Sequence, residues 1–262
     1  EKHLKVFSRV IKITFADPSL PLPDSALQHL DHLAHVKTVR FDDTQITDAG
    51  MKHLRRLTNL ESVYLIDTPI SDEGLRHLSE LSSLKHVYLS HTRVGDAGLK
   101  HLESLTDLEL LVLDNTEVGD SGLQHVGKLT DLLVLILDNT HVTDAGLAHL
   151  RGLTDLVGLD LRGTQVTGTG LDHLRGLPNL EGVSLDSTPI TDAGVVHLRG
   201  LPSLQSLGLN DTEVTDAGLR HLRGITSLSL LNVENTKASR AGVDDLRRAL
   251  PNCRIKWTPP SE

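Results

Sequence analysis

Hydrophobic residues follow one short pattern many times along the chain. Leu60, Val63 and Leu65 give the spacing L-x-x-L-x-L, whose final step of two residues predicts a short strand. A polar turn follows, and apolar residues then recur three and four apart, as in residues 48–54, which predicts a short helix. Each unit of the pattern is therefore expected to hold one strand and one helix.

The pattern recurs every 24 residues. A glycine marks each unit, at Gly50, Gly74, Gly98, Gly122, Gly146, Gly170, Gly194, Gly218 and Gly242. A threonine stands six positions before every one of these glycines, from Thr44 to Thr236. One degenerate unit precedes them around Ala26, so residues 22–244 are predicted to form a single array of about ten repeats.

Short polar residues mark the predicted helix starts. Ser, Thr or Gly stands three residues before each recurring glycine, and Asp stands two before it in seven of the nine units. Such residues are favoured at helix N-termini, where the helix dipole also favours a carboxylate. The sequence does not show which of the two positions is the cap.

These residues resemble the leucine-rich repeat superfamily, in the short form with the consensus LxxLxLxxTxITDAGLxHL that bacterial multi-repeat proteins carry. F-box-associated and ribonuclease-inhibitor-type repeats are similar but longer, and no F-box is present. The resemblance implies an α/β fold, a curved leucine-rich-repeat solenoid. One parallel β-sheet would line its concave face and short helices its convex face. Physical reasoning agrees, because a unit this small buries its apolar side only by stacking on its neighbours.

We expect one domain over residues 1–262, with an N-terminal cap (1–21), the repeats (22–244) and a C-terminal cap (245–262). A first strand is predicted within residues 10–15. Ile255 and Trp257 stand where a further unit would place its strand residues, so they are expected to close the core at the other end.

Composition narrows the classes of partner and chemistry. Only six residues are aromatic, so the core must be aliphatic, and the formal charge of -9 argues against a general binder of nucleic acid or anionic membranes. The single Cys253 excludes an intrachain disulfide and a cysteine metal cluster. No apolar run is long enough to span a membrane and no signal peptide opens the chain. Because the chain starts at Glu1, we expect a fragment of a longer protein; the sequence indicates no compartment, and we expect a monomer.

Recurring polar residues are interpreted as structural. The threonine hydroxyls are expected to bond to the backbone of their own and the adjacent coil. A histidine at His53 recurs in every later unit up to His221, and neighbouring helices lie about 8–10 Å apart, too far for adjacent imidazoles to share one zinc. We therefore predict no metal and no cofactor. Aligned protonated histidines would nevertheless lower stability in acid.

No catalytic motif is complete. Residues 122–128 match the spacing of a phosphate-binding loop, but Leu129 stands where Ser or Thr should hold magnesium. The constant 24-residue step also leaves no long loop to build a pocket or lid. We predict that the protein is not an enzyme and has no catalytic residues; a hydrolase built on chance Ser, His and Asp neighbours is the alternative.

The variable strand positions predict a binding surface on the concave face. Apolar and aromatic residues gather there, with aspartates at their border, as in protein-binding hot spots. The predicted concave patch consists of Tyr64, Ile66, His86, Tyr88, Leu110, Val112, Val134 and Ile136, with Asp114 and Asp138. The simpler interpretation is that such residues only suit strands.

The sequence therefore favours a non-enzymatic scaffold that binds a protein or peptide. Acidic residues outnumber basic ones on this face, which favours a partner with a basic surface. A row of arginines at Arg151, Arg175, Arg199 and Arg223 is interpreted as a solvated row at helix ends. Two alternatives stay open: a module that recognises glycans or cell walls, and a structural spacer within a larger protein.

Overall fold

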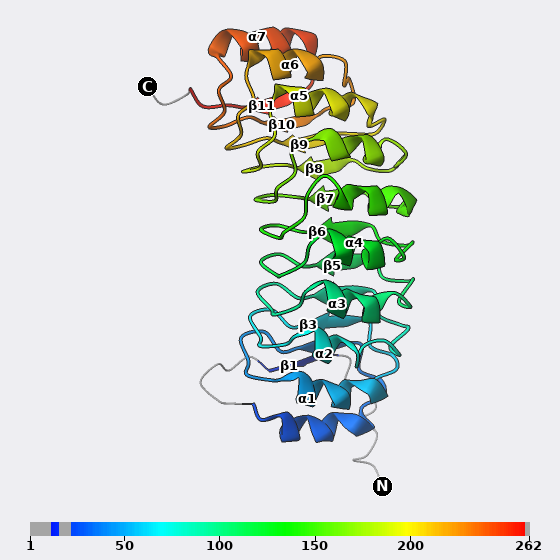
Figure 1. Cartoon of the computed structure of the whole chain (residues 1–262). Coiled ribbons are helices and arrows are strands. Elements are labelled where there is room, and N and C mark those ends of the chain that lie inside the picture. Colours follow the sequence, from blue (N-terminus) through cyan, green and yellow to red (C-terminus); the bar gives the residue numbers. More distant parts are fainter. Residues whose placement is uncertain (1–11, 16–21, 260–262) are drawn as a thin grey trace, which may run out of the picture. The chain divides into compact units, whose positions relative to one another are not determined.

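The computed structural model of the chain describes residues 12–15 and 22–259. The chain divides into two compact units, Glu1–Leu132 and Leu133–Glu262. Within each unit, short strands alternate with short helices, and the strands run parallel in sequence order (Figure 1). The predicted alternation of strand and helix is therefore confirmed throughout the described residues.

The first unit contains the parallel strands β1 to β5. Their bounds are β1 Lys12–Thr14, β2 Thr38–Arg40, β3 Ser62–Tyr64, β4 His86–Tyr88 and β5 Leu110–Val112. Each pairs with the next without offset, as Val63 with Val87. The helices between them are η1 Asp24–His32, α1 Asp48–Met51, η2 Lys52–Arg56, α2 Asp72–Leu75, α3 Asp96–Leu99, η3 Lys100–Leu102 and α4 Asp120–Val126.

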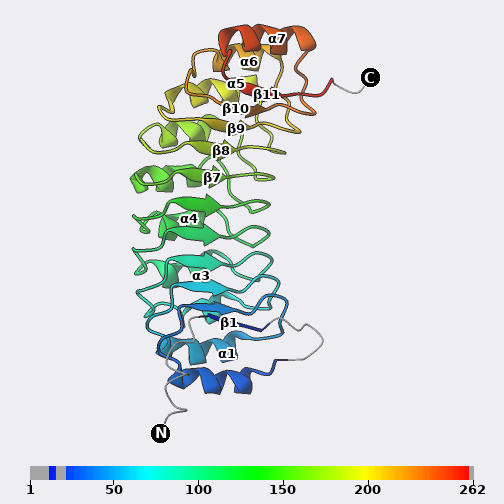
Figure 2. The same ribbon diagram turned by 180° about the vertical axis from the view of Figure 1, so that it is seen from behind.

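The second unit repeats the same plan with the strands β6 to β11, seen from behind in Figure 2. The strands are β6 Val134–Ile136, β7 Gly158–Asp160, β8 Gly182–Ser184, β9 Ser206–Gly208, β10 Leu230–Asn232 and β11 Arg254–Lys256. The helices are η4 Gly146–Gly152, η5 Thr169–Leu174, α5 Asp192–Val195, η6 Val196–Gly200, α6 Asp216–Leu222 and α7 Arg240–Ala249. None of the described helices is long and apolar enough to cross a bilayer.

Stacked aliphatic layers form the core of both units. The middle residue of each strand from β2 to β10 is buried, as are the leucines around it, while the first and third strand residues are mostly half-buried. We use the name open face for the side of the strands on which these first and third residues lie. Because one pattern fills every layer, the core leaves the open face free to differ between repeats.

A tight turn follows each strand. The residue before the threonine has a left-handed backbone in nine turns, with φ from 53° at Asn139 to 65° at Gly163. Asn, Asp and Gly tolerate this conformation best. A threonine directly follows the left-handed residue of each turn. The hydroxyl of Thr68 donates to the carbonyl of Leu65 at 2.6 Å. The predicted bond of the threonine to its own turn is therefore present from Thr68 to Thr236. The buried hydroxyl of Thr44 has no hydrogen-bond partner among the described residues, and the expected bond to the adjacent coil stays a prediction.

Aspartates at the helix starts join consecutive repeats. Asp48 accepts hydrogen bonds from the backbone N–H of Ser71 at 2.8 Å and from its hydroxyl at 2.6 Å. Asp216 accepts the equivalent pair from Ser239, both at 2.7 Å. The recurring glycine makes room for this carboxylate, because a Cβ at Gly74 would lie 2.5 Å from Asp48 Oδ1. We call this pairing of an aspartate with the next repeat's glycine the Asp–Gly ladder.

Two of the nine repeats lack the ladder aspartate: the last one, where Arg240 stands at that position, and the one that contains Gly170. In the latter repeat, Gly168 stands in its place with φ of 113°, a conformation that suits only glycine, and its Cα packs close to the backbone of Gly194. The next helix, α5, begins after Thr191, whose side chain makes no capping hydrogen bond. At this step a close backbone approach replaces the carboxylate.

Aromatic rings lie near both ends of the described chain. Phe15, directly after β1, stacks on Phe41 with ring centroids 5.1 Å apart. Ile255 lies in β11, and the indole N–H of Trp257 donates to the carbonyl of Ala238 at 3.0 Å. Ile255 pairs with Leu231 of β10, and both Ile255 and Trp257 are half-buried, so the expected closure of the core by these two residues stays a prediction. Residues 10 and 11 of the predicted first strand lie outside the described residues.

Candidate functional site

The first-unit part of the predicted patch lies on three neighbouring strands. Tyr64 in β3 pairs in register with Tyr88 in β4, which pairs with Val112 in β5. His86 pairs with Leu110 in the row beside them. We call this part of the open face the tyrosine face, consisting of Arg40, Tyr64, Ile66, His86, Tyr88, Leu110, Val112 and Asp114.

An aromatic stack occupies the centre of the tyrosine face. The rings of Tyr64 and Tyr88 lie almost parallel, 8° apart, with centroids 4.1 Å from each other. The guanidinium of Arg40 lies 4.6 Å from the Tyr64 ring centroid. Since Arg40 and Tyr88 come from the strands on either side of Tyr64, they cover its two opposite ring faces. The stack therefore presents ring edges and hydroxyl groups outwards.

Tyr88 stays protonated over the usual pH range. Burial, together with a hydrogen bond to the Tyr64 hydroxyl, raises the pKa of Tyr88 to about 12. A neutral phenol both donates and accepts hydrogen bonds. The centre of the tyrosine face is therefore an uncharged, hydrogen-bonding ridge.

Carboxylates at the border are held by neighbouring groups. Asp42 forms an ion pair with Arg40 and accepts from the backbone N–H of Ile66 at 3.1 Å. Asp114 accepts from the hydroxyl of Ser90 at 2.5 Å and from the amide of its neighbour Asn115 at 2.9 Å. These bonds fix the carboxylates, so the border of the tyrosine face is rigid as well as acidic.

His86 takes part in the one arrangement on this face that resembles a catalytic set. Ser62 Oγ lies 3.0 Å from His86 Nδ1, and Glu109 Oε2 lies 3.9 Å from His86 Nε2. The Glu109 distance is too long for a hydrogen bond, and Lys85 already donates to Glu109 at 2.5 Å. Ser62 is buried, and its backbone N–H donates to the carbonyl of Lys37. The geometry does not provide an activated nucleophile with an oxyanion site.

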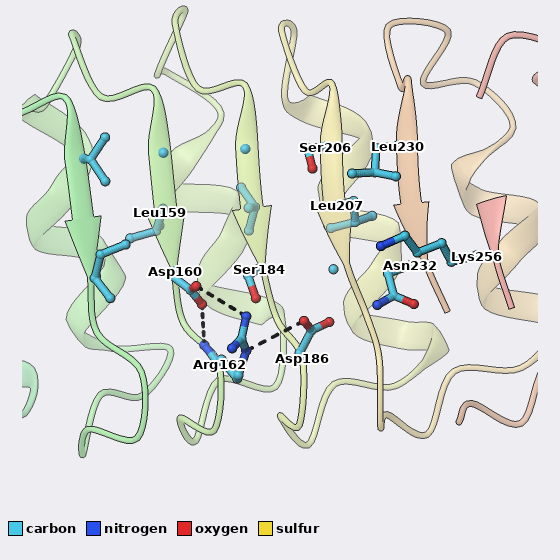
Figure 3. A pocket seen from close by; sticks show the side chains of 16 residues that line it. Leu159, Asp160, Arg162, Ser184, Asp186, Ser206, Leu207, Leu230, Asn232 and Lys256 are labelled. Carbon is cyan, nitrogen blue, oxygen red and sulfur yellow. Dashed lines mark hydrogen bonds and ion pairs between the residues drawn. The ribbon is translucent and has the colours of Figure 1, made fainter. Parts of the chain in front are cut away.

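The rest of the predicted patch lies in the second unit. Val134 and Ile136 are the half-buried outer residues of β6, and Asp138 follows that strand. Val134 and Ile136 line a shallow hollow of about 340 Å³ over β7, β8 and β9 (Figure 3). Gly158 and Gly182, the first residues of β7 and β8, also line this hollow.

An arginine among three carboxylates borders this hollow. Arg162 lies 3.6 Å from Asp138, 3.7 Å from Asp160 and 3.8 Å from Asp186 (Figure 3). Asp186 accepts from the backbone N–H of Asn210 at 2.7 Å, yet burial raises the pKa of its carboxyl above the ordinary value despite the nearby cation. The repeat spacing could have revealed this cluster, because each aspartate stands about one repeat from the next.

The histidine column lies apart from the open face, on and beside the helices. His125 Nδ1 lies 2.7 Å from Glu103, His197 Nδ1 lies 2.7 Å from Asp172, and the hydrogen bond lowers the pKa of each carboxyl. His77 is buried. In the described part of the chain, no three His, Cys, Asp or Glu side chains are placed to hold a metal ion.

Comparison with known proteins identifies the repeat and the fold. Residues 80–102 match the family model described as "Leucine Rich repeat". An internalin (inlF) from Listeria monocytogenes is similar with a TM-score of 0.60 and 21% identity, over 90% of this chain and 77% of that one. The leucine-rich-repeat protein LIC12759 of Leptospira interrogans follows with a TM-score of 0.56 and 17% identity, over 87% of this chain and 74% of that one.

A second Listeria monocytogenes protein, internalin C2 (inlC2), covers 96% of both chains with 21% identity and a TM-score of 0.53. A search of curated proteins found no match. The resemblance to the leucine-rich repeat superfamily, and the fold of parallel strands and short helices that it implied, are therefore confirmed.

Proposed function

We propose that this chain, which has the leucine-rich-repeat fold, is a non-enzymatic scaffold that binds a protein or peptide through its open face. The tyrosine face is the centre of the site in the first unit. The observation that carries the proposal is the Arg40–Tyr64–Tyr88 stack, which holds two large rings in one geometry on an otherwise variable surface.

A pre-stacked ridge suits protein binding for an energetic reason. Association costs free energy wherever flexible side chains must become ordered, and Tyr64 and Tyr88 are already held by each other and by Arg40. Tyr and Arg are also the residue types most often found at binding hot spots. The apolar Leu110 and Val112 beside the stack provide area that a partner can cover, and the fixed border carboxylates favour a partner with basic groups.

The stack also favours a protein over a glycan. Sugars bind aromatic residues by lying flat against a free ring face. Both faces of Tyr64 are covered, by Arg40 and by Tyr88, so that mode is blocked at Tyr64 and at the face of Tyr88 that Tyr64 covers. The acidic balance of the chain, with 35 acidic against 26 basic residues, disfavours nucleic acid.

The test is a binding measurement on paired variants. A partner recovered with the wild-type chain as bait is titrated against Tyr64→Ala/Tyr88→Ala, and we expect its Kd to rise by at least about tenfold. The matched control is Gln124→Ala/Lys128→Ala, two exposed residues of the helix side of the same unit, which should leave the Kd unchanged. Circular dichroism checks that both variants are folded.

Two further variants test separate parts of the open face. Tyr64→Phe/Tyr88→Phe retains the stack and should keep most of the affinity. Val134→Ala/Ile136→Ala probes the second-unit part of the predicted patch. An unchanged Kd for the Tyr-to-Ala pair, in a folded protein, would contradict the proposal.

A further inference from the structure

The hollow in the second unit is a second open-face feature that the tyrosine face does not explain. It covers β7 to β9 and is lined by Gly158, Gly182, Val134, Ile136 and Leu230, the last of which is labelled in Figure 3. Because the two glycines carry no side chain, the strand backbone at these positions forms the floor of the hollow. Its volume of about 340 Å³ lies at the lower end of the range for small-ligand pockets. The space exists because neighbouring outer positions carry no side chain.

The fold does not require glycine at the floor positions. A Cβ at Gly158 would lie 3.7 Å from the methyl groups of Val134, and one at Gly182 would lie 4.0 Å from the carbonyl of Val157, both ordinary contacts. At the ladder glycine Gly170, by contrast, a Cβ would lie 2.5 Å from the carbonyl oxygen of Asp144.

Glycine inside a strand weakens the strand by about 0.5–1 kcal/mol, and it often marks a place where a ligand approaches the backbone. The two floor glycines therefore leave room on the face at a cost in stability that the packing does not explain. Gly208 has another role: a Cβ there would lie 2.6 Å from Asp186 Oδ1, so its absence lets that carboxylate lie over β9.

The charges at the edge of the hollow favour a cation. Asp138, Asp160 and Asp186 surround the single guanidinium of Arg162, and Lys256 also lines the hollow, so these five groups together carry an excess of one negative charge when ionised. The three Arg162 distances, 3.6 to 3.8 Å, exceed hydrogen-bond length, so the guanidinium is shared among the carboxylates without being tightly bonded to any. Lys256 lies at the other side of the hollow, beyond Asn232 (Figure 3).

A floor of backbone and aliphatic sides next to carboxylates matches a side chain with an apolar stem and a cationic head. Sugar stacking is disfavoured, because Trp257 is the one aromatic residue among residues 133–262 and its indole is bonded to Ala238. Phosphate groups would meet the carboxylates and be repelled. We propose that the hollow over β7 to β9 binds a lysine side chain from an extended segment of a protein partner, with the stem over Gly158 and Gly182 and the ammonium at Asp160 and Asp186.

This inference extends the proposed function to the second unit, and its test does not depend on the tyrosine face or on knowing the partner. The probe is an acetylated and amidated pentapeptide of glycine with one central lysine. Its matched control has norleucine, which keeps the stem and removes the charge. The whole chain, labelled with ²H and ¹⁵N, is titrated at low salt while NMR follows the amide signals of Gly158 and Gly182.

We expect saturable shifts of both glycine signals with the lysine peptide, and binding at least about tenfold weaker with the norleucine peptide. Gly182→Val should abolish the shift at Gly158 while the protein stays folded, whereas Gly176→Val, with open space around it at a helix end, should leave binding unchanged. Asp186→Asn should weaken binding by at least about threefold, and Asp155→Asn, an exposed residue with the same change of charge, should not.

The inference is overturned if no saturable shift occurs, if the lysine and norleucine peptides bind equally, or if Gly182→Val binds like the wild type. Equal weakening by Asp186→Asn and Asp155→Asn would also overturn it, because the attraction would then come from the net charge of the chain. None of these outcomes bears on the Tyr64→Ala/Tyr88→Ala result.

Discussion

The open faces of β3 to β5 and of β7 to β9 are built on the same repeat and have opposite surfaces. In the first unit, Tyr64 and Tyr88 occupy the third positions of β3 and β4 and stack on each other. In the second unit, Gly158 and Gly182 occupy the first positions of β7 and β8, and the surface is hollow. The layers beneath are equivalent, with buried Val63 under one and Leu159 under the other.

This difference shows where recognition is encoded. The ladder residues, the turn and the core leucines fix the backbone of each repeat, so a change at an outer strand position alters the surface without altering the fold. A ridge suits a partner with a groove or a flat apolar area, whereas a hollow suits a partner with a protruding side chain.

The largest effect is expected when the tyrosine stack of the first unit is removed. Tyr64→Gly/Tyr88→Gly should lower the free energy of unfolding by about 4 kcal/mol, from two lost half-buried rings, their stacking and the added backbone freedom. Urea unfolding followed by circular dichroism measures the change. Tyr64→Phe/Tyr88→Phe should lose little. A loss below about 1 kcal/mol would show that the rings serve contact alone.

A smaller effect on stability should distinguish the ladder glycine Gly170 from the floor glycine Gly158. Gly170→Val should cost about 2–3 kcal/mol, because its side chain would collide with the backbone of Asp144. Gly158→Val should instead raise stability by up to about 1 kcal/mol, since valine suits a strand and has room there. Thermal unfolding of the two variants compares them directly. Destabilisation by Gly158→Val would mean that the hollow is a requirement of the fold.

The smallest effect is the loss of stability of the first unit at acid pH. Burial, with the nearby charges of Arg55 and Arg76, lowers the pKa of His77 in the folded first unit, so folding favours its neutral form. This stabilisation is complete above the unfolded pKa near 6.5 and is lost as pH falls through the lowered folded pKa. The corresponding His173 in the second unit is half-buried.

The thermal midpoint of the first unit should therefore fall between pH 7.5 and pH 5, and His77→Gln should reduce that fall. Tyrosine fluorescence reports the first unit and Trp257 the second, so the two can be followed in one sample. A midpoint that does not move over this range, or an equal fall in the His77→Gln variant, would contradict the prediction.

Most of the fold could be predicted from the sequence because the same spacing recurs in every repeat. Strand and helix positions follow from where the apolar residues stand, as for Leu60, Val63 and Leu65. The Asp–Gly ladder could not be predicted this way. Asp48 looked like a helix-start residue of its own repeat, but it bonds across to Ser71, and Thr47 is the residue whose side chain accepts from its own helix. The sequence of a single repeat does not indicate that its aspartate accepts hydrogen bonds from the next repeat.

The candidate site was predicted less completely. The sequence correctly places Tyr64 next to Tyr88, since both occupy the same repeat position. Arg40 stands at that position one repeat earlier, so the spacing contained its contact with Tyr64 although residue type alone did not suggest it. The hollow was missed because glycine contributes no side chain to a list of surface residues, and an empty space is a property of several strands together.

The Asp–Gly ladder also makes the number of repeats adjustable. Apart from segments that carry Gly168 or Arg240 at the aspartate position, a 24-residue segment of the array contains one carboxylate for the following coil and one glycine for the preceding one. Copying or deleting such a segment therefore leaves every remaining carboxylate opposite a glycine. Even removal of the repeat that contains Gly168 would place Asp144 beside Gly194 and restore an ordinary junction. The protein can thus gain or lose whole repeats, together with the open-face residues that they carry, with no compensating change elsewhere in the chain.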